Sequence, residues 1–137
     1  MQVTFDGKVY ECDSALRGDD YVLLFTSGQP NVSFYGVVDF SAFQLSGGEW
    51  SYPYVTLPAD GWQGDSAPYT QNVVYAGVTP SNDVLYAPRM EELTSKDLDV
   101  LTAAKISATY QGDGYLTFTA FGDKPKTDVK FNVKTLF

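Results

Sequence analysis

The chain has 137 residues, with 17 Asp and Glu against nine Lys and Arg, no histidine and a single cysteine, Cys12. Without histidine, Ser-His-Asp catalysis, Cys-His catalysis and His-ligated metal sites are excluded. One cysteine excludes an intrachain disulfide and a cysteine-rich zinc site. The net charge of −8 argues against nucleic acid and anionic membrane surfaces as partners, because both attract clustered Lys and Arg.

The apolar stretches of the chain are too short to cross a membrane, so no membrane insertion is expected. The first ten residues, MQVTFDGKVY, lack the basic and then apolar pattern of a cleaved signal peptide, which favours synthesis in the cytoplasm. Aromatic residues make up 15% of the chain, and 12 Gly and 7 Pro interrupt it often. This composition favours an all-β fold, because aromatic side chains suit a pleated, half-buried surface.

Charge and turn residues divide the chain into two predicted modules. Residues 1–50 carry seven acids and two bases, a net charge of −5, and read as an N-terminal β-meander. Residues 51–137 read as a C-terminal antiparallel β-sandwich module with one short helix. Within this module, residues 51–80 carry only two charged side chains, Asp60 and Asp65.

The N-terminal module opens with a predicted hairpin, in which Gln2–Phe5 and Val9–Cys12 flank the turn Asp6-Gly7. We expect Cys12 to be a small buried residue rather than a nucleophile. The segment Asp13–Asp20 is predicted to form a tight turn with solvated acids. Further strands are predicted at Tyr21–Thr26, Val32–Val38 and Phe40–Leu45.

The C-terminal module contains the one predicted helix. Thr94 and Asp97 have the spacing of an N-terminal capping box, which predicts a helix of about 8–12 residues that begins between Arg89 and Ser95. Strands are predicted at Tyr54–Leu57, Thr70–Val78, Val84–Ala87, Lys105–Tyr110, Tyr115–Phe121 and Asp128–Lys134. In the last strand, Lys130 and Lys134 alternate with apolar residues and are expected to face solvent.

Three segments of this module resemble a known family. They are VTLPADGW (55–62), APYTQNVVYAGVTPSNDV (67–84) and GDGYLTFTAFGDKPKTDVKFNV (112–133). Together they resemble a small β-module of tail-fibre and baseplate-type proteins of phages and prophages of Firmicutes, over about residues 54–135. A weaker resemblance, to a short leader on similar proteins, covers FYGVVDFSAF and LSGGEW within residues 34–50.

The resemblance implies a non-enzymatic, tail-associated structural protein of a virion, a tail fibre or a baseplate component that could contact the host. Its implied partners are sister copies, in symmetric oligomers such as trimers, and neighbouring tail proteins. The family has no catalytic residues to transfer to this chain. With the excluded His and Cys chemistry and the acidic charge, we expect no catalytic residue, no cofactor, no metal site and no nucleic-acid partner.

Five aromatic residues around the uncharged zone form the candidate interaction surface: Trp50, Tyr52, Tyr54, Trp62 and Tyr69. Exposed Tyr and Trp side chains offer large contact area at low entropic cost and are common in binding sites. The competing interpretation is that Trp62 plugs one end of the sandwich and that the tyrosines line the junction between the modules.

Two other functions are compatible with these residues. The aromatic set could form a carbohydrate-binding surface that recognises a receptor glycan on the cell, since aromatic faces stack on sugar rings. The acidic balance also fits an inhibitor that mimics nucleic acid and blocks a host defence nuclease, although the acids are spread over turns rather than run together.

Overall fold

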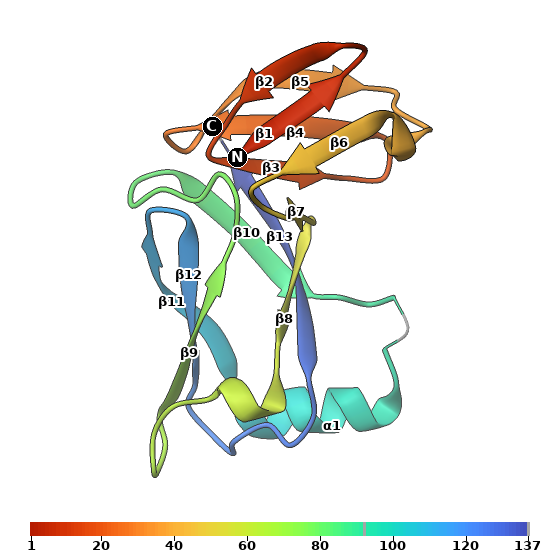
Figure 1. Cartoon of the computed structure of the whole chain (residues 1–137). Helices are drawn as coiled ribbons and strands as arrows, with labels where there is room; N and C mark the ends of the chain where they lie inside the picture. The colour runs from red at the N-terminus through yellow and green to blue at the C-terminus, as the bar shows by residue number, and fades with distance from the viewer. Residues whose placement is uncertain (92, 137) are drawn as a thin grey trace. The chain divides into compact units, whose positions relative to one another are not determined.

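A computed structural model of the protein describes residues 1–91 and 93–136. Its backbone contacts divide the chain into two compact units, Met1–Pro53 and Tyr54–Phe137, called here the N-terminal and the C-terminal unit. Strands dominate both units, and the one α-helix among the described residues lies in the C-terminal unit (Figure 1). Each unit also contains one short 3-10 helix, Phe40–Ala42 and Ala59–Gly61. The predicted all-β fold with one short helix is therefore confirmed.

The N-terminal unit consists of two small sheets, with strand orders β2-β1-β6 and β5-β4-β3-β7. Their strands are β1 (Gln2–Phe5), β2 (Lys8–Glu11), β3 (Ser14–Arg17), β4 (Tyr21–Thr26), β5 (Gln29–Tyr35), β6 (Phe43–Ser46) and β7 (Trp50–Ser51). The hairpins β1–β2, β3–β4 and β4–β5 are antiparallel. Two long-range pairings are added to them: β6 returns to β1, and β7 runs parallel to β3.

The core of this unit lies between the two sheets, where Val3 of β1, Val22 and Leu24 of β4 and Phe43 of β6 are buried together. Phe5, Phe34 and Phe43 pack ring against ring, with centroid distances of 4.3–5.2 Å. Such aromatic contacts add to the hydrophobic energy of burial. Cys12 belongs to the same cluster, as predicted, and burial raises the pKa of its thiol.

Several sequence-based predictions in this unit differ from the structure. The strand predicted at Val32–Val38 is Gln29–Tyr35, and the one predicted at Phe40–Leu45 starts only at Phe43, after a 3-10 helix at Phe40–Ala42. The segment 13–20, expected as a single tight turn, contains the strand β3. Ala15 and Leu16 lie opposite Leu24 and Leu23 of β4, and both are buried. The apolar pair is too short to produce a recognisable alternation, so only its tertiary partners reveal it as a strand.

The C-terminal unit is a sandwich of two three-stranded antiparallel sheets, ordered β10-β13-β8 and β11-β12-β9. Its elements are β8 (Tyr54–Leu57), β9 (Tyr69–Val74), β10 (Asp83–Pro88), α1 (Ser95–Ala104), β11 (Ile106–Gly112), β12 (Tyr115–Ala120) and β13 (Val129–Leu136). A β-bulge interrupts the β11–β12 pairing between Ala108 and Tyr110. Figure 1 shows α1 across the end of the sandwich where β8 ends and β13 begins.

Alternation along the strands sets the sandwich core. Along β13 the buried Val129, Phe131 and Val133 alternate with exposed residues that include Lys130 and Lys134, as predicted. Leu116 and Phe118 of β12 are fully buried, and the rings of Phe118 and Phe131 lie 5.2 Å apart. Phe131 comes from one sheet and Phe118 from the other, so this contact joins the two layers.

Helix α1 has the predicted N-terminal cap. The Thr94 hydroxyl accepts a hydrogen bond from the Asp97 backbone N–H, and the Asp97 carboxylate accepts one from the Thr94 backbone N–H. This capping box satisfies two groups that a helix start leaves unpaired. At the other end Lys105 adopts a left-handed conformation (φ 52°), and the backbone N–H groups of Gly122 and Asp123 donate to the last carbonyls of the helix.

Candidate functional site

The structure places the five predicted aromatic residues in different environments. In the N-terminal unit, Trp50 is half-buried at the edge of the core. Its ring packs edge-on against that of Phe43, with 6.1 Å between the ring centres. Tyr52 follows β7 and is exposed. Trp50 thus contributes to packing, and Tyr52 is the more accessible of the two.

The other three aromatic residues lie in the C-terminal unit. Trp62 is only 3% exposed and belongs to the core, so its ring is not available as a stacking surface in this conformation. Its indole N–H has no hydrogen-bond partner among the described residues. Tyr69 is half-buried, with the Lys124 ammonium 5.7 Å from its ring centre. Tyr54, the first residue of β8, lines a pocket.

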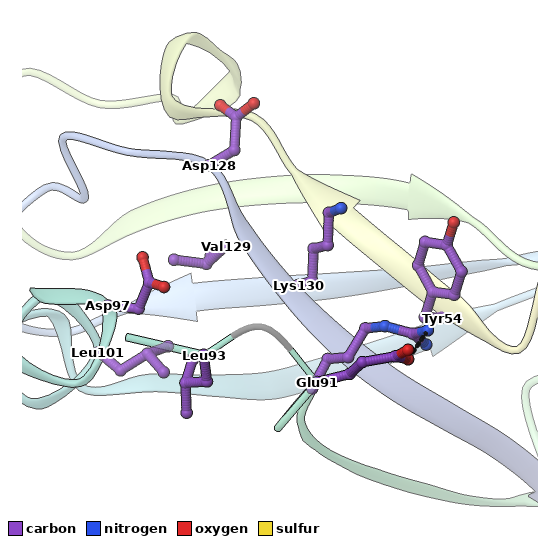
Figure 2. A pocket seen from close by; sticks show the side chains of 9 residues that line it. Tyr54, Glu91, Leu93, Asp97, Leu101, Asp128, Val129 and Lys130 are labelled. Carbon is purple, nitrogen blue, oxygen red and sulfur yellow. Dashed lines mark hydrogen bonds and ion pairs between the residues drawn. The ribbon is translucent and has the colours of Figure 1, made fainter. Parts of the chain in front are cut away.

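This pocket has a volume of about 330 Å³ and lies entirely in the C-terminal unit. It is lined by Tyr54, Arg89, Glu91, Leu93, Asp97, Leu101, Asp128, Val129 and Lys130. Figure 2 shows Asp97 and Asp128 toward one end of the pocket and Tyr54 with Glu91 toward the other. Strands β8 and β13, the start of α1 and the segment after β10 therefore all contribute to its wall.

The two cationic side chains of the pocket, Arg89 and Lys130, both lie near the ring of Tyr54. The Arg89 guanidinium lies 4.2 Å from the ring centre of Tyr54 and donates to Glu91 at 2.6 Å and to Asn132 at 3.1 Å. The Lys130 ammonium lies 5.8 Å from the same ring. Tyr54 thus provides an aromatic face to two cations, an arrangement that attracts them through the ring quadrupole.

Two carboxylates of the pocket, Asp97 and Asp128, accept hydrogen bonds from backbone N–H groups. Asp128 accepts a hydrogen bond from the Ala59 backbone N–H, across 69 residues of sequence. Asp97 closes the capping box of α1, and the hydrogen bonds from the backbone and hydroxyl of Thr94 lower its pKa. These charged groups therefore already have partners within the fold. Arg89 joins the segment after β10 to Asn132 of β13, and Asp97 is paired within the cap of α1.

No concentration of metal-binding groups accompanies these acids. Within residues 1–91 and 93–136, no three Asp, Glu or Cys side chains come together in a way that could hold a metal ion. The same part of the chain contains no helix that is long and apolar enough to cross a membrane.

A second surface of the C-terminal unit lies outside the five aromatic residues predicted from the sequence. The strands β9, β11 and β12 contain no Asp, Glu, Lys or Arg at any position. The outer surface of their sheet, called here the uncharged face, carries Thr70, Asn72, Val74, Tyr110, Tyr115 and Thr117. A run of strands without charge, two of which alternate polar and apolar residues, is the sequence signal that could have identified it.

The register places these side chains beside one another. Thr117 of β12 lies between Asn72 of β9 and Tyr110 of β11, and its hydroxyl donates to the Asn72 side chain at 2.7 Å. Tyr115 lies between Val74 and Gly112 in the neighbouring row. The rings of Tyr110 and Tyr115 have centres 6.0 Å apart, and Val74 is 84% exposed.

Gly112 gives Tyr115 its position on this face. A Cβ atom at residue 112 would lie 2.1 Å from the Tyr115 ring, so the ring lies directly over the glycine backbone. Only glycine allows an aromatic ring to lie this close to the strand opposite. Burial, the nearby Tyr110 hydroxyl and its hydrogen bond raise the pKa of Tyr115.

Comparison of the chain with protein-family models, with curated proteins and with solved structures found no match.

Proposed function

We propose that this chain is a non-enzymatic structural component of a phage or prophage tail, a tail fibre or baseplate protein located in the virion. The observation that carries the proposal is where the family-like segments lie in the fold. Their apolar residues Trp62, Phe118 and Phe131 are buried in the C-terminal unit. The resemblance therefore concerns residues that build a sandwich, which supports a shared module rather than a shared short motif.

The proposed role is assembly. The strands supply a rigid scaffold, and exposed apolar side chains supply area for contact with sister copies or neighbouring tail proteins. In the N-terminal unit, Tyr35 is 78% and Val38 92% exposed. Such exposed side chains offer apolar area that a partner can bury. The net charge of −8 would keep the free subunit soluble before it assembles.

The charged pocket supports a scaffold role over catalysis. Its two cations and its three carboxylates contact each other, an aromatic ring or the backbone. A general acid or base needs a perturbed pKa and access to a substrate. Asp97, whose pKa is lowered, owes that shift to the helix cap.

Two measurements on the full chain test this proposal. Analytical ultracentrifugation at micromolar concentration is expected to show a symmetric oligomer, with a trimer as the favoured form. Mass spectrometry of purified phage particles, induced from the bacterium that carries the gene, is expected to detect the chain. A protein that stays monomeric and is absent from the particles would rule the proposal out.

A matched pair of variants would locate the contact surface. Val38→Ser removes an exposed apolar side chain of the N-terminal unit, and Leu98→Ser removes one from α1 in the C-terminal unit. If copies associate through the N-terminal unit, Val38→Ser weakens the oligomer and Leu98→Ser leaves it intact. The reverse result would move the contact to the C-terminal unit.

A further inference from the structure

From its geometry and chemistry, we propose that the uncharged face of the C-terminal unit binds a neutral saccharide chain, with Tyr110 and Tyr115 as its stacking residues. This inference does not depend on the tail role proposed above. It also moves saccharide recognition away from the aromatic residues that the sequence suggested, since Trp62 is buried and Tyr54 contacts two cations.

The first argument is charge. The whole chain carries 26 ionisable Asp, Glu, Lys and Arg residues, yet the three strands of this sheet carry none. A charged ligand would find no counter-ion on the face, whereas an uncharged ligand would leave no charge desolvated there. The chemistry of the face therefore favours a neutral partner.

The second argument is the kind of group that the face presents. Thr70, Asn72 and Thr117 supply hydroxyl and amide groups, which donate and accept hydrogen bonds as sugar hydroxyls do. Tyr110 is 59% exposed, and its ring lies beside that of Tyr115. Aromatic rings pack against the C–H face of a pyranose while their hydroxyls reach its polar rim.

The third argument is that the side chains of the uncharged face are held in fixed positions by their neighbours. The Tyr115 ring lies over Gly112, where any larger residue would displace it, and its hydroxyl interacts with that of Tyr110. The Thr117 hydroxyl is tied to Asn72. Side chains that are already fixed lose less entropy when a ligand binds, which is the advantage of a preorganised site.

The size of the face distinguishes a saccharide from a protein partner. Thr70 and Val74 are four residues apart on β9, about 14 Å along the strand, and three strands span about 10 Å from β9 to β11. A stable protein interface buries about 800 Å² on each partner, several times the area of such a patch. A short oligosaccharide fits this surface without extending beyond it.

The test is a titration of the full-length protein, labelled with ¹⁵N, with cellohexaose, chitohexaose and maltohexaose, and with hexagalacturonate as the anionic control. At least one neutral chain is expected to shift amide resonances of β9, β11 and β12, and hexagalacturonate is expected to bind more weakly. Tyr110→Ala and Tyr115→Ala should each weaken binding by about tenfold, the loss of one stacking contact. Tyr35→Ala, which removes a similarly exposed tyrosine of the N-terminal unit, should leave the affinity for the saccharide unchanged.

Gly112→Ala provides an independent variant, because it keeps both tyrosines and only lifts the Tyr115 ring from the strand. It should weaken binding as Tyr115→Ala does. Circular dichroism verifies that each variant folds. If Tyr115→Ala does not fold, Tyr110→Ala still tests the proposal, because Tyr110 is exposed. The proposal is overturned if no neutral chain shifts any resonance, if the shifts lie outside this sheet, or if Tyr110→Ala binds normally. Shifts of the same face that depend on protein concentration without sugar would also overturn it in favour of a second copy.

Discussion

The two outer faces of the C-terminal sandwich use the same architecture for different chemistry. On the β10-β13-β8 sheet, Lys130 and Lys134 point outward, and Arg89 beyond β10 contacts Tyr54 and Asn132. On the β11-β12-β9 sheet, hydroxyl, amide and aromatic groups occupy the equivalent positions, with no charge among them. The two faces share one core but differ in what remains free to bind.

The difference shows why a pocket is not by itself the best candidate site. The pocket of about 330 Å³ on the charged side is lined by charged groups that already have partners in the fold. On the uncharged face, Tyr110 is 59% exposed and Tyr115 is partly exposed, so both rings are accessible to a ligand. A ligand of the pocket would have to displace these charged partners, and an ionised group left without its partner is costly to bury.

The largest expected effect tests the shared core. Phe118→Ala removes a fully buried ring that contacts Phe131 of the other sheet, and it should lower the free energy of unfolding by about 3–5 kcal/mol. Urea denaturation of the full chain measures the loss, and the exposed Tyr110→Ala is the matched control, with a loss below about 1 kcal/mol. Similar losses for both variants would contradict the assignment of Phe118 to a common core.

A smaller effect is expected from the cap of α1 on the charged side. Thr94→Ala breaks the capping box and should cost about 1 kcal/mol in unfolding free energy. Thr70→Ala, a threonine on the uncharged face, should cost less. Because the folded pKa of Asp97 is lowered, its support is present above its ordinary pKa of 3.8 and is lost as the pH falls through the folded value. Acid unfolding curves that are identical for the wild type and Thr94→Ala would contradict this role.

The uncharged face should be sensitive to alkali. The folded pKa of Tyr115 is raised above its ordinary value of 10.0 by burial and by Tyr110, so the stability it supports is present below that value. That stability is lost as the pH rises through the folded pKa. Tyr110→Phe should move the Tyr115 midpoint down toward 10.0, as followed by NMR of labelled tyrosines, whereas Tyr35→Phe should not move it. An unmoved midpoint in Tyr110→Phe would mean that the two rings are not coupled.

The smallest effect is expected for the ion pair of the charged side. Glu91→Gln removes the partner of Arg89, but the Glu91 side chain is 72% exposed. Exposed pairs contribute at most about 1 kcal/mol, and salt screens them. The unfolding temperature of Glu91→Gln should therefore be slightly below that of the wild type at low salt and equal to it in molar salt. A large loss would show that Arg89 depends on Glu91 to keep its place over Tyr54.

Much of the fold could be predicted from local patterns. The Asp6-Gly7 hairpin, the alternation in β13 and the cap at Thr94 depend on neighbours in the sequence, and each is present in the structure. Strand β3 could not be predicted, because Ala15 and Leu16 become recognisable as strand residues only when β4 lies beside them. Long-range pairings such as β6 with β1 also leave no local trace.

The candidate site was harder to predict than the fold. The sequence predicts one surface formed by five aromatic residues. In the structure Trp62 is buried in the core, and the ring of Tyr54 contacts two cations. Their burial depends on which face of each strand points inward, and this follows from the tertiary register. The contact between Tyr110 and Tyr115 cannot be predicted from the sequence, because a hairpin and a β-bulge must form before the rings meet.

The sequence alone therefore determined the excluded chemistry, the all-β class and the cap of the one helix, since these follow from residue types and short spacings. The tertiary structure decided which aromatic rings are buried, which charges pair and which face is left without charge. These outcomes depend on contacts between residues far apart in the chain, such as Asp128 with Ala59 and Thr117 with Asn72. Pairing in a sheet brings such residues together, and no local pattern encodes it.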